Sequence, residues 1–182
     1  MSRYLDRILG CLVGGAAGDA LGYPVEFQSY DQICRAYGPE GVQSYALDRH
    51  GKALISDDTQ MTLFTANGIL TGAARAATRG ISGPVHTYIA RAYQNWLNTQ
   101  SSLYRRSGEA QRCWLCDVPE LSASRAPGTT CLSALENNRR TKRCQVALDQ
   151  PCNHSKGCGG IMRVAPLALY HFRNSLEELV EE

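Results

Sequence analysis

The amino-acid sequence predicts a single all-α domain, and three observations support this prediction. The apolar segments recur at three- and four-residue steps, which is the spacing of one face of a helix. No segment of any length alternates apolar and polar residues as a half-buried strand does, and no internal repeat or heptad run occurs. With 182 residues and 43% hydrophobic content the chain can bury one substantial core, so we expect residues 1–182 to form one domain.

The charge and cysteine content indicate which partners and compartment to expect. A formal net charge of +2, from 19 basic and 17 acidic residues, creates no general field for nucleic acid or an anionic membrane, so neither is an expected partner. The N-terminus lacks the basic start and long apolar run of a signal peptide, and Asp19 interrupts the Gly/Ala-rich segment, so no membrane span is expected. The eight cysteines are expected to be reduced thiols in the cytoplasm rather than a disulfide framework.

The first helix is expected to begin near Tyr4 and to lead into a loop that carries two acids. Its apolar residues keep helical spacing: Leu5, Ile8, Leu9, Leu12 and Ala16. Four glycines weaken this helix, so we expect burial against a close neighbour to hold it together. Residues 18–27 are expected to form a loop in which Asp19 is a solvated acid. Glu26 is a candidate site residue, because its apolar neighbours favour withdrawal of the carboxylate from water.

The most informative stretch is Ser56-Asp57-Asp58-Thr59-Gln60-Met61-Thr62, which follows an irregular connection and begins a helical pattern that continues to Gly80. One interpretation is structural: Ser56 caps the helix, and the helix dipole stabilises the two acids by ~0.3 to 1 kcal/mol each. The other is functional: Ser56, Asp57 and Asp58 supply hard oxygen ligands to Mg²⁺ or Mn²⁺. A pair of metal ions needs more carboxylates than two, and Asp19 and Glu26 are the nearest candidates.

A third helix is expected after Pro84. Its aromatic stripe is interpreted as core: Val85, Tyr88, Ile89, Ala92, Tyr93, Trp96 and Leu97. Residues 101–128 lose this periodicity and are expected to form a long surface loop around Cys113-Trp114-Leu115-Cys116. A short helix is expected over residues 130–136, and the basic run 139–143 that closes it is interpreted as a solvated face.

A glycine-rich stretch, Ser155 to Arg163, precedes an apolar segment over residues 164–170. Its backbone N–H groups can approach a phosphate, with Lys156 and Arg163 as counter-charges, and a tight structural turn is the alternative interpretation. Residues 175–182 begin a helix with a capping box but reach Glu182 without a C-terminal cap. We therefore expect the chain to be cut short relative to its domain.

The cysteines permit two further hypotheses. The first is a zinc site, although the sequence has neither a second CxxC nor a regular Cys/His spacing. The available ligands are Cys113, Cys116, Cys131, Cys144, Cys152, His154 and Cys158. A catalytic Cys158 is the other, but no sequence feature supplies its base. Scattered or buried thiols are the simpler interpretation.

Three segments in this order resemble the ADP-ribosylglycohydrolase family, the group that includes the dinitrogenase-reductase-activating glycohydrolase. They are Gly14 to Gly22 with Glu26, then Ser56 to Thr62, then Gly157 to Arg163. Pro127-Gly128-Thr129-Thr130 also resembles the family's segment between the second and third motifs. The resemblance covers essentially the whole chain.

The resemblance implies a compact orthogonal all-α domain with a binuclear Mg²⁺ or Mn²⁺ centre. The implied activity is hydrolysis of the glycosidic bond that joins ADP-ribose to a modified protein or small molecule. By motif position Ser56, Asp57 and Asp58 match the metal ligands, and Glu26 matches a glutamate beside the metals and substrate, so Glu26, Asp57 and Asp58 are the candidate catalytic residues. The candidate substrate-binding residues for the diphosphate and ribose are Ser155, Lys156, Gly157, Cys158, Gly159 and Gly160.

One departure from the family pattern motivates an alternative function. Family members complete the metal centre with a distal Asp-x-Asp-Thr or Asp-x-Asp-Ser motif, and nothing like it follows Arg163. A Thr-His-Gly-His-Pro-like segment is missing too. The chain therefore resembles the N-terminal two thirds of the domain, with half of the ligands missing. The alternative to an active hydrolase is a truncated, non-catalytic module that binds ADP-ribose or a protein partner.

Overall fold

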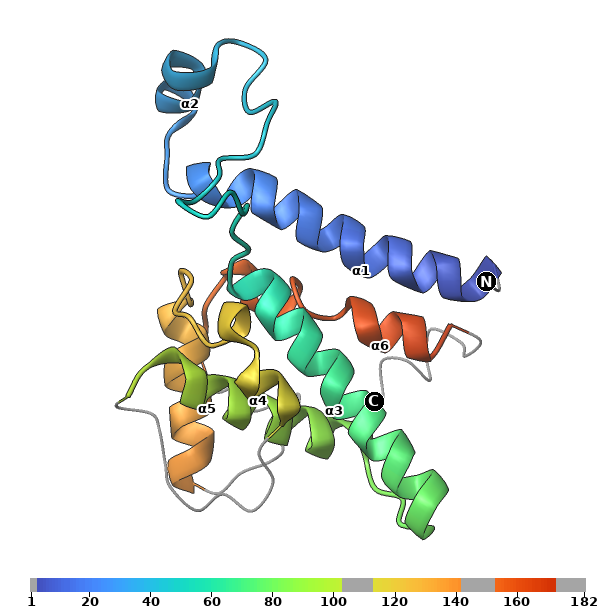
Figure 1. Cartoon of the computed structure of the whole chain (residues 1–182). Helices are drawn as coiled ribbons and strands as arrows, with labels where there is room; N and C mark the ends of the chain where they lie inside the picture. The colour runs from blue at the N-terminus through green and yellow to red at the C-terminus, as the bar shows by residue number, and fades with distance from the viewer. Residues whose placement is uncertain (1–2, 103–112, 142–152, 173–182) are drawn as a thin grey trace.

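The computed structural model describes residues 3–102, 113–141 and 153–172, and within these ranges it confirms the all-α prediction. No strand occurs there, and extended pairing is limited to one isolated bridge between Leu47 and Ala53. Figure 1 shows the helices α1 Arg3–Gly22, α2 Tyr30–Tyr37, α3 Asp57–Arg79, α4 Val85–Gln100, α5 Thr129–Thr141 and α6 Ala165–Tyr170. Four 3-10 turns join them: η1 Tyr23–Val25, η2 Trp114–Asp117, η3 Pro119–Leu121 and η4 Cys158–Gly160.

The core lies where α4 packs on α3. Met61 and Phe64 of α3 and Trp96 and Leu97 of α4 are fully buried, so the stripe after Pro84 is core as predicted. The helices approach closely because α3 carries glycine at the contact: a Cβ on Gly68 would lie 2.6 Å from Ile89 Cα. Backbone therefore packs against backbone at this crossing.

Replacement by alanine is expected to change stability in opposite directions at Gly68, which lies at the α3–α4 contact, and at Gly10 on α1. We expect Gly68→Ala to lower the free energy of unfolding by about 2 kcal/mol, because overpacking costs about 3 kcal/mol and the gain in helix propensity returns about 1. Gly10→Ala on α1 is the matched control, since no described atom outside its chain neighbours and the backbone of its own helix lies within 4 Å of its Cβ position, and it should raise stability by about 1 kcal/mol. Urea denaturation measures both, and equal effects of the two substitutions would contradict the close α3–α4 crossing.

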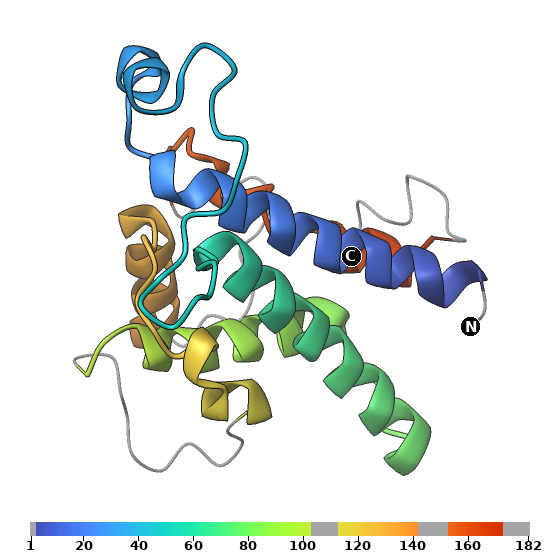
Figure 2. The same cartoon turned by 45° about the horizontal axis from the view of Figure 1, so that its top comes forward.

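Helix α1 lies against the start of α3 and runs alongside α6, as the two views in Figures 1 and 2 show. Its first turn is tied to the end of α6, where Tyr4 Oη donates to Leu169 O at 2.6 Å and the Tyr4 ring lies 4.3 Å from that of Phe172. Ala20 is the one buried residue of α1, and the Cβ positions of its glycines are open. The expectation that burial holds this helix together is therefore wrong for the described residues.

Arg3–Val25 is long and apolar enough to cross a membrane by length and composition alone, a test that core helices and signal sequences of soluble proteins also pass. The expectation of no membrane partner stays a prediction.

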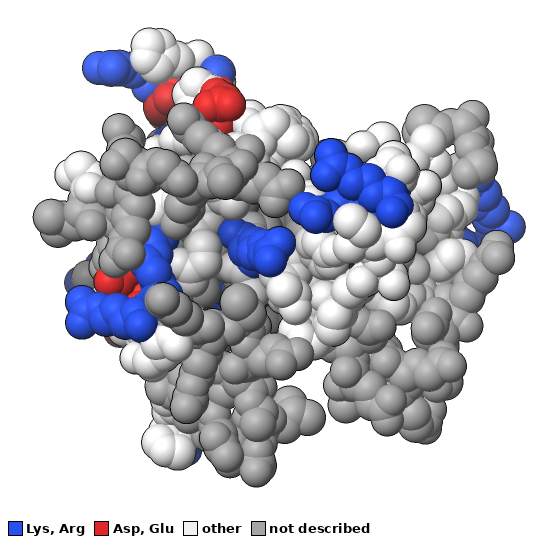
Figure 3. Space-filling view, turned by 90° about the horizontal axis from the view of Figure 1, so that it is seen from below, with Lys and Arg blue, Asp and Glu red and all other residues white. Residues whose placement is uncertain are grey.

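Figure 3 shows one face of the molecule, on which Lys and Arg side chains occur in separate groups rather than one continuous band.

The predicted surface loop over residues 101–128 is only partly one. Residues 103–112 lie outside the described ranges, and from Cys113 onward the chain folds into η2 and η3. Leu115, Cys116 and Leu121 are buried in the core, so this half is not a surface loop. Its apolar residues cover the α3–α4 pair, a non-local contact that leaves no periodicity in the sequence.

Helix α5 is longer than predicted, because it includes part of the basic run. The Arg139 side chain is only 7% exposed, and it donates to Gln94 Oε1 at 2.9 Å and Asn98 Oδ1 at 2.8 Å on α4. The solvated-face interpretation is therefore wrong for Arg139, whereas Arg140 is 73% exposed. Lys142, Arg143 and the capping box expected in residues 175–182 lie outside the described ranges.

Candidate functional site

The acidic pair begins α3, as predicted. Ser56 is the N-cap, and its Oγ accepts from Asp58 N at 3.1 Å. Two loop groups far along the chain hold Asp57: its N–H donates to Arg125 O at 2.9 Å, and its Oδ2 accepts from Gly128 N at 3.4 Å. The Pro127–Thr130 segment therefore lies against the acidic pair. The helix-cap interpretation is confirmed, and it leaves both carboxylates available to a further partner.

Asp19 is not in a loop, because α1 continues through Gly22 and places this acid in its last turns. It is half-buried, and its Oδ2 accepts from Ser56 N at 2.9 Å, Thr59 N at 3.3 Å and Thr59 Oγ1 at 2.5 Å. The interpretation of Asp19 as a solvated acid of a turn is therefore wrong. Its partners lie 37 and 40 residues further along the chain, so no local pattern indicates them.

Glu26 follows η1 and lies at the mouth of the site. Its side chain is exposed, and neighbouring Phe27 is 80% exposed, so the argument that apolar neighbours bury this acid is wrong. Partial desolvation and the negative charges of Asp58 and Asp19 nevertheless raise the pKa of Glu26 above its ordinary value. The acid is therefore perturbed by the site rather than by its sequence neighbours.

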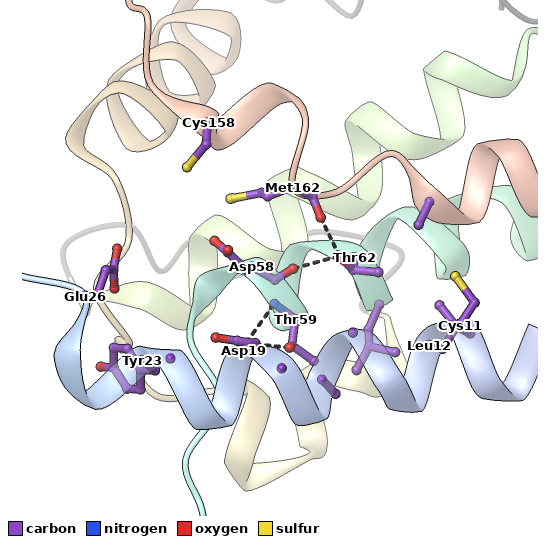
Figure 4. A pocket seen from close by; sticks show the side chains of 16 residues that line it. Cys11, Leu12, Asp19, Tyr23, Glu26, Asp58, Thr59, Thr62, Cys158 and Met162 are labelled. Atoms are coloured by element: carbon purple, nitrogen blue, oxygen red, sulfur yellow. Dashed lines mark hydrogen bonds between the residues drawn. The ribbon is translucent and has the colours of Figure 1, made fainter. Parts of the chain in front are cut away.

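Two cavities meet at these acids. The larger, of about 540 Å³, lies between α1, α3 and the η4–α6 segment, and Figure 4 shows Asp19 and Tyr23 on one side of it and Cys158 and Met162 opposite. The smaller, of about 390 Å³, lies between the acids, the start of α5 and the glycine-rich stretch. Four residues line both cavities: Glu26, Asp58, Cys158 and Met162. Asp57 lines only the smaller of the two cavities.

The electrostatics of the acidic pair differ from those of solvated carboxylates. Burial raises the pKa of Asp57 to about 6, and the charges of Asp58 and Glu26 act in the same direction, while the Gly128 N–H opposes them. Burial and the charge of Asp19 likewise raise the pKa of Asp58. Carboxylates that repel one another in a partly desolvated pocket are stabilised by a cation between them.

This pKa predicts a pH dependence of stability in the protein without metal. Asp57 has a folded-state pKa of about 6 against an ordinary value of 3.8, so the folded protein keeps a proton that the unfolded chain has released. The associated stability is complete below about pH 4 and is lost as the pH rises through about 6. Urea denaturation from about pH 4 to about pH 7 should show a larger loss in the wild-type protein than in Asp57→Asn, where the raised pKa values of Asp58 and Glu26 still contribute a smaller loss, and parallel profiles would contradict it.

The glycine-rich stretch faces the acids across the smaller cavity. Five of the six candidate substrate-binding residues line it: Ser155, Gly157, Cys158, Gly159 and Gly160. Lys156 is exposed and is not among the residues that line either cavity. Ser155 Oγ accepts from Gly157 N at 3.2 Å, and a Cβ on Gly159 would lie 2.5 Å from Cys131 Sγ, so a larger residue there would require the Cys131 side chain to shift. The structure thus brings together most of this predicted set.

The donor chemistry fits a hard divalent cation in part. Asp57, Asp58 and Glu26 line one cavity, and carboxylate oxygens are the ligands that Mg²⁺ and Mn²⁺ prefer. Within the described ranges no group of three or more His, Cys, Asp or Glu side chains converges closely enough to hold an ion by itself. Mg²⁺ keeps several waters in protein sites, so these residues supply an incomplete ligand set that water or substrate can extend.

The zinc hypothesis finds no support in the described residues, where no group of three or more His, Cys, Asp or Glu side chains could hold a metal ion. Cys113 Sγ accepts from Leu115 N at 3.4 Å, and Cys116 Sγ donates to Asn95 O at 3.8 Å, so both thiols have local partners. Cys144 and Cys152 lie outside the described ranges. The six described cysteines are free thiols, and Cys158 is exposed and lines both cavities.

Sequence reasoning missed several residues that build the site. Thr59, Gly128 and Cys131 each contact an acid or the glycine-rich stretch. Gln60 is fully buried and donates to Ala123 O at 2.9 Å, which fixes the loop that holds Asp57. The polar Gln60 within an apolar helical pattern was a usable signal, because a buried amide needs partners. Thr59 and Gly128 lie in segments that carry the family resemblance, but no sequence spacing indicated their contacts.

The comparisons with known proteins give one match. The family model described as ADP-ribosylglycohydrolase matches residues 1–182. The search of curated proteins and the search of solved structures found no match.

Proposed function

The chain belongs to the ADP-ribosylglycohydrolase family, and from this premise we propose that its pocket cleaves the glycosidic bond between ADP-ribose and a modified protein or small molecule. The observation that carries the proposal is the meeting of three acids with the glycine-rich stretch in one cavity. Acids on one wall suit a cation and the ribose, and backbone N–H groups on the other suit a diphosphate.

Each residue has a role in this proposal. Asp57 and Asp58, with the hydroxyl of Ser56, would hold Mg²⁺ or Mn²⁺, whose Lewis-acid chemistry offsets charge that develops as the anomeric bond breaks. Glu26 is suited to hold or release a proton, because its pKa is raised and its exposed side chain lies at the mouth of both cavities. The backbone N–H groups of Cys158, Gly159 and Gly160 would bind the diphosphate, because the Gly157 N–H already donates to Ser155 Oγ.

Arg163 adds positive charge to the same cavity. Its guanidinium lies 4.7 Å from the centre of the Tyr93 ring, and Nη1 contacts Met61 Sδ at 3.3 Å. These contacts hold the guanidinium against the α3–α4 core, and Arg163 also lines the smaller cavity. We propose Arg163, rather than Lys156, as the counter-charge to the diphosphate. The proposal also includes one domain over residues 1–182 and a cytoplasmic location.

The experiment is an assay of ADP-ribose release. The substrates are an arginine-linked protein, a serine-linked peptide and an ester-linked small molecule, each with Mn²⁺, with Mg²⁺ and with excess chelator. We expect release from at least one substrate with a divalent cation and none with the chelator. No release from any substrate, combined with metal-independent binding of ADP-ribose measured by calorimetry, would overturn hydrolysis and support the non-catalytic module instead.

A further inference from the structure

The first turn of α3 is closed by a residue of another helix. A helix leaves its first N–H groups without partners, and a capping box satisfies the N-cap N–H with a long side chain three residues later. Here the N-cap is Ser56, and the residue three positions later is Thr59, whose side chain is too short for this role. Asp19 Oδ2 accepts from Ser56 N at 2.9 Å in its place.

The same oxygen also holds the far side of the turn. It accepts from Thr59 N at 3.3 Å and from Thr59 Oγ1 at 2.5 Å, so one carboxylate oxygen of α1 binds the residues on both sides of the acidic pair. Thr59 is buried, which makes loss of its hydroxyl partner costly. Asp58 lies between these anchors, so its backbone cannot rotate unless the contacts with Asp19 break.

The hydrogen bonds that Asp19 accepts at the start of α3 do not require its negative charge. An asparagine side-chain oxygen accepts hydrogen bonds from the same donors. The carboxylate instead places a third negative charge in the larger cavity, which Asp58 and Glu26 also line. In a pocket that holds a cation, this charge is favourable rather than costly.

We propose that Asp19 is a positioning residue of the site: it holds the start of α3 so that Asp58 faces the cavity, and its charge strengthens cation binding there. The inference rests on the proposed function for the cation, whereas the positioning of α3 does not depend on it. Asp19 acts through Ser56, Thr59 and Asp58 and does not itself need to touch substrate.

The test compares Asp19→Asn and Asp19→Ala with Asp6→Asn, an acid that lies exposed on the same helix. Two quantities are measured: the Mn²⁺ dissociation constant by calorimetry, and amide hydrogen exchange at Ser56 and Thr59. We expect both Asp19 variants to bind Mn²⁺ about tenfold more weakly or worse, as loss of partners that orient metal ligands does. Asp19→Ala should also speed exchange at both amides by about tenfold or more, while Asp6→Asn matches the wild-type protein.

A second pair of variants keeps the inference testable if Asp19→Ala does not fold. Thr59→Ser retains the hydroxyl that Asp19 accepts, whereas Thr59→Val removes it at similar volume. We expect weaker Mn²⁺ binding in Thr59→Val and near-normal binding in Thr59→Ser. Unchanged Mn²⁺ affinity in the Asp19 variants, or unchanged amide exchange in Asp19→Ala, would overturn the inference. A wild-type protein that binds no Mn²⁺ would instead overturn the proposed function and the charge role, while amide exchange would still decide the positioning role.

Discussion

Asp58→Asn should lower the rate of ADP-ribose release by about 10² to 10³-fold, the loss typical of removing one preorganised electrostatic group from an active site. Asp58 lines both cavities, and it shares the larger one with Glu26 and Asp19. The amide has almost the same shape as the carboxylate, and the Asp58 N–H still donates to Ser56 Oγ, so the helix start is retained. The substitution therefore removes charge and little else.

The stability of Asp58→Asn distinguishes an effect of the lost charge on activity from an effect of impaired folding. Because burial and the negative charge of Asp19 raise the pKa of Asp58, neutralising it should leave the free energy of unfolding unchanged or slightly higher. Asp31→Asn on the exposed face of α2 is the matched control and should retain full activity. An Asp58→Asn protein that hydrolyses substrate within about threefold of wild type would exclude Asp58 from the chemistry.

Trp96→Ala should lower the free energy of unfolding by about 4 kcal/mol, because it empties the largest fully buried side-chain volume of the described core. The indole also donates from Nε1 to Gln60 Oε1 at 3.0 Å, and Gln60 holds the loop carbonyls of Glu120 and Ala123. Trp96→Phe should cost less, since it keeps most of the volume and loses only the donor. Urea denaturation followed by far-UV circular dichroism measures both.

Trp114→Ala is the control for this substitution, because the Trp114 side chain is 67% exposed. It should change stability by no more than about 0.5 kcal/mol. Equal losses in the two tryptophan variants would contradict the assignment of the core to the α3–α4 contact.

The fold was predictable where local pattern and tertiary burial agree. The start of α3 at Ser56 and the core stripe through Trp96 follow from capping and periodicity, which act within a few residues. Helix α2 was missed, although Ser29 and Gln32 form a capping box that the sequence displays. The burial of Leu115 and Arg139 could not be predicted, because each depends on α4, which is distant in the sequence.

The identities of the main site residues could be predicted from the sequence, whereas the contacts that position them could not. The carboxylates of Asp57 and Asp58 and the glycines after Lys156 were identified by chemistry, and the structure places them around one cavity. The capping role of Asp19 and the Gly128 N–H at Asp57 depend on how α1 and the loop before α5 pack on α3. These contacts join residues 37 and 71 positions apart, so no sequence spacing reports them.

The central claim, that the acids at the start of α3 bind a divalent cation, is tested most directly by calorimetric titration of Mn²⁺ at about pH 6 in buffers of different ionisation enthalpy. Because the pKa of Asp57 is about 6, binding should release a substantial fraction of a proton from the wild-type protein. Asp57→Asn should bind more weakly and release less. A wild-type protein that binds no Mn²⁺, or an Asp57→Asn protein with the same affinity and proton release, would contradict the claim.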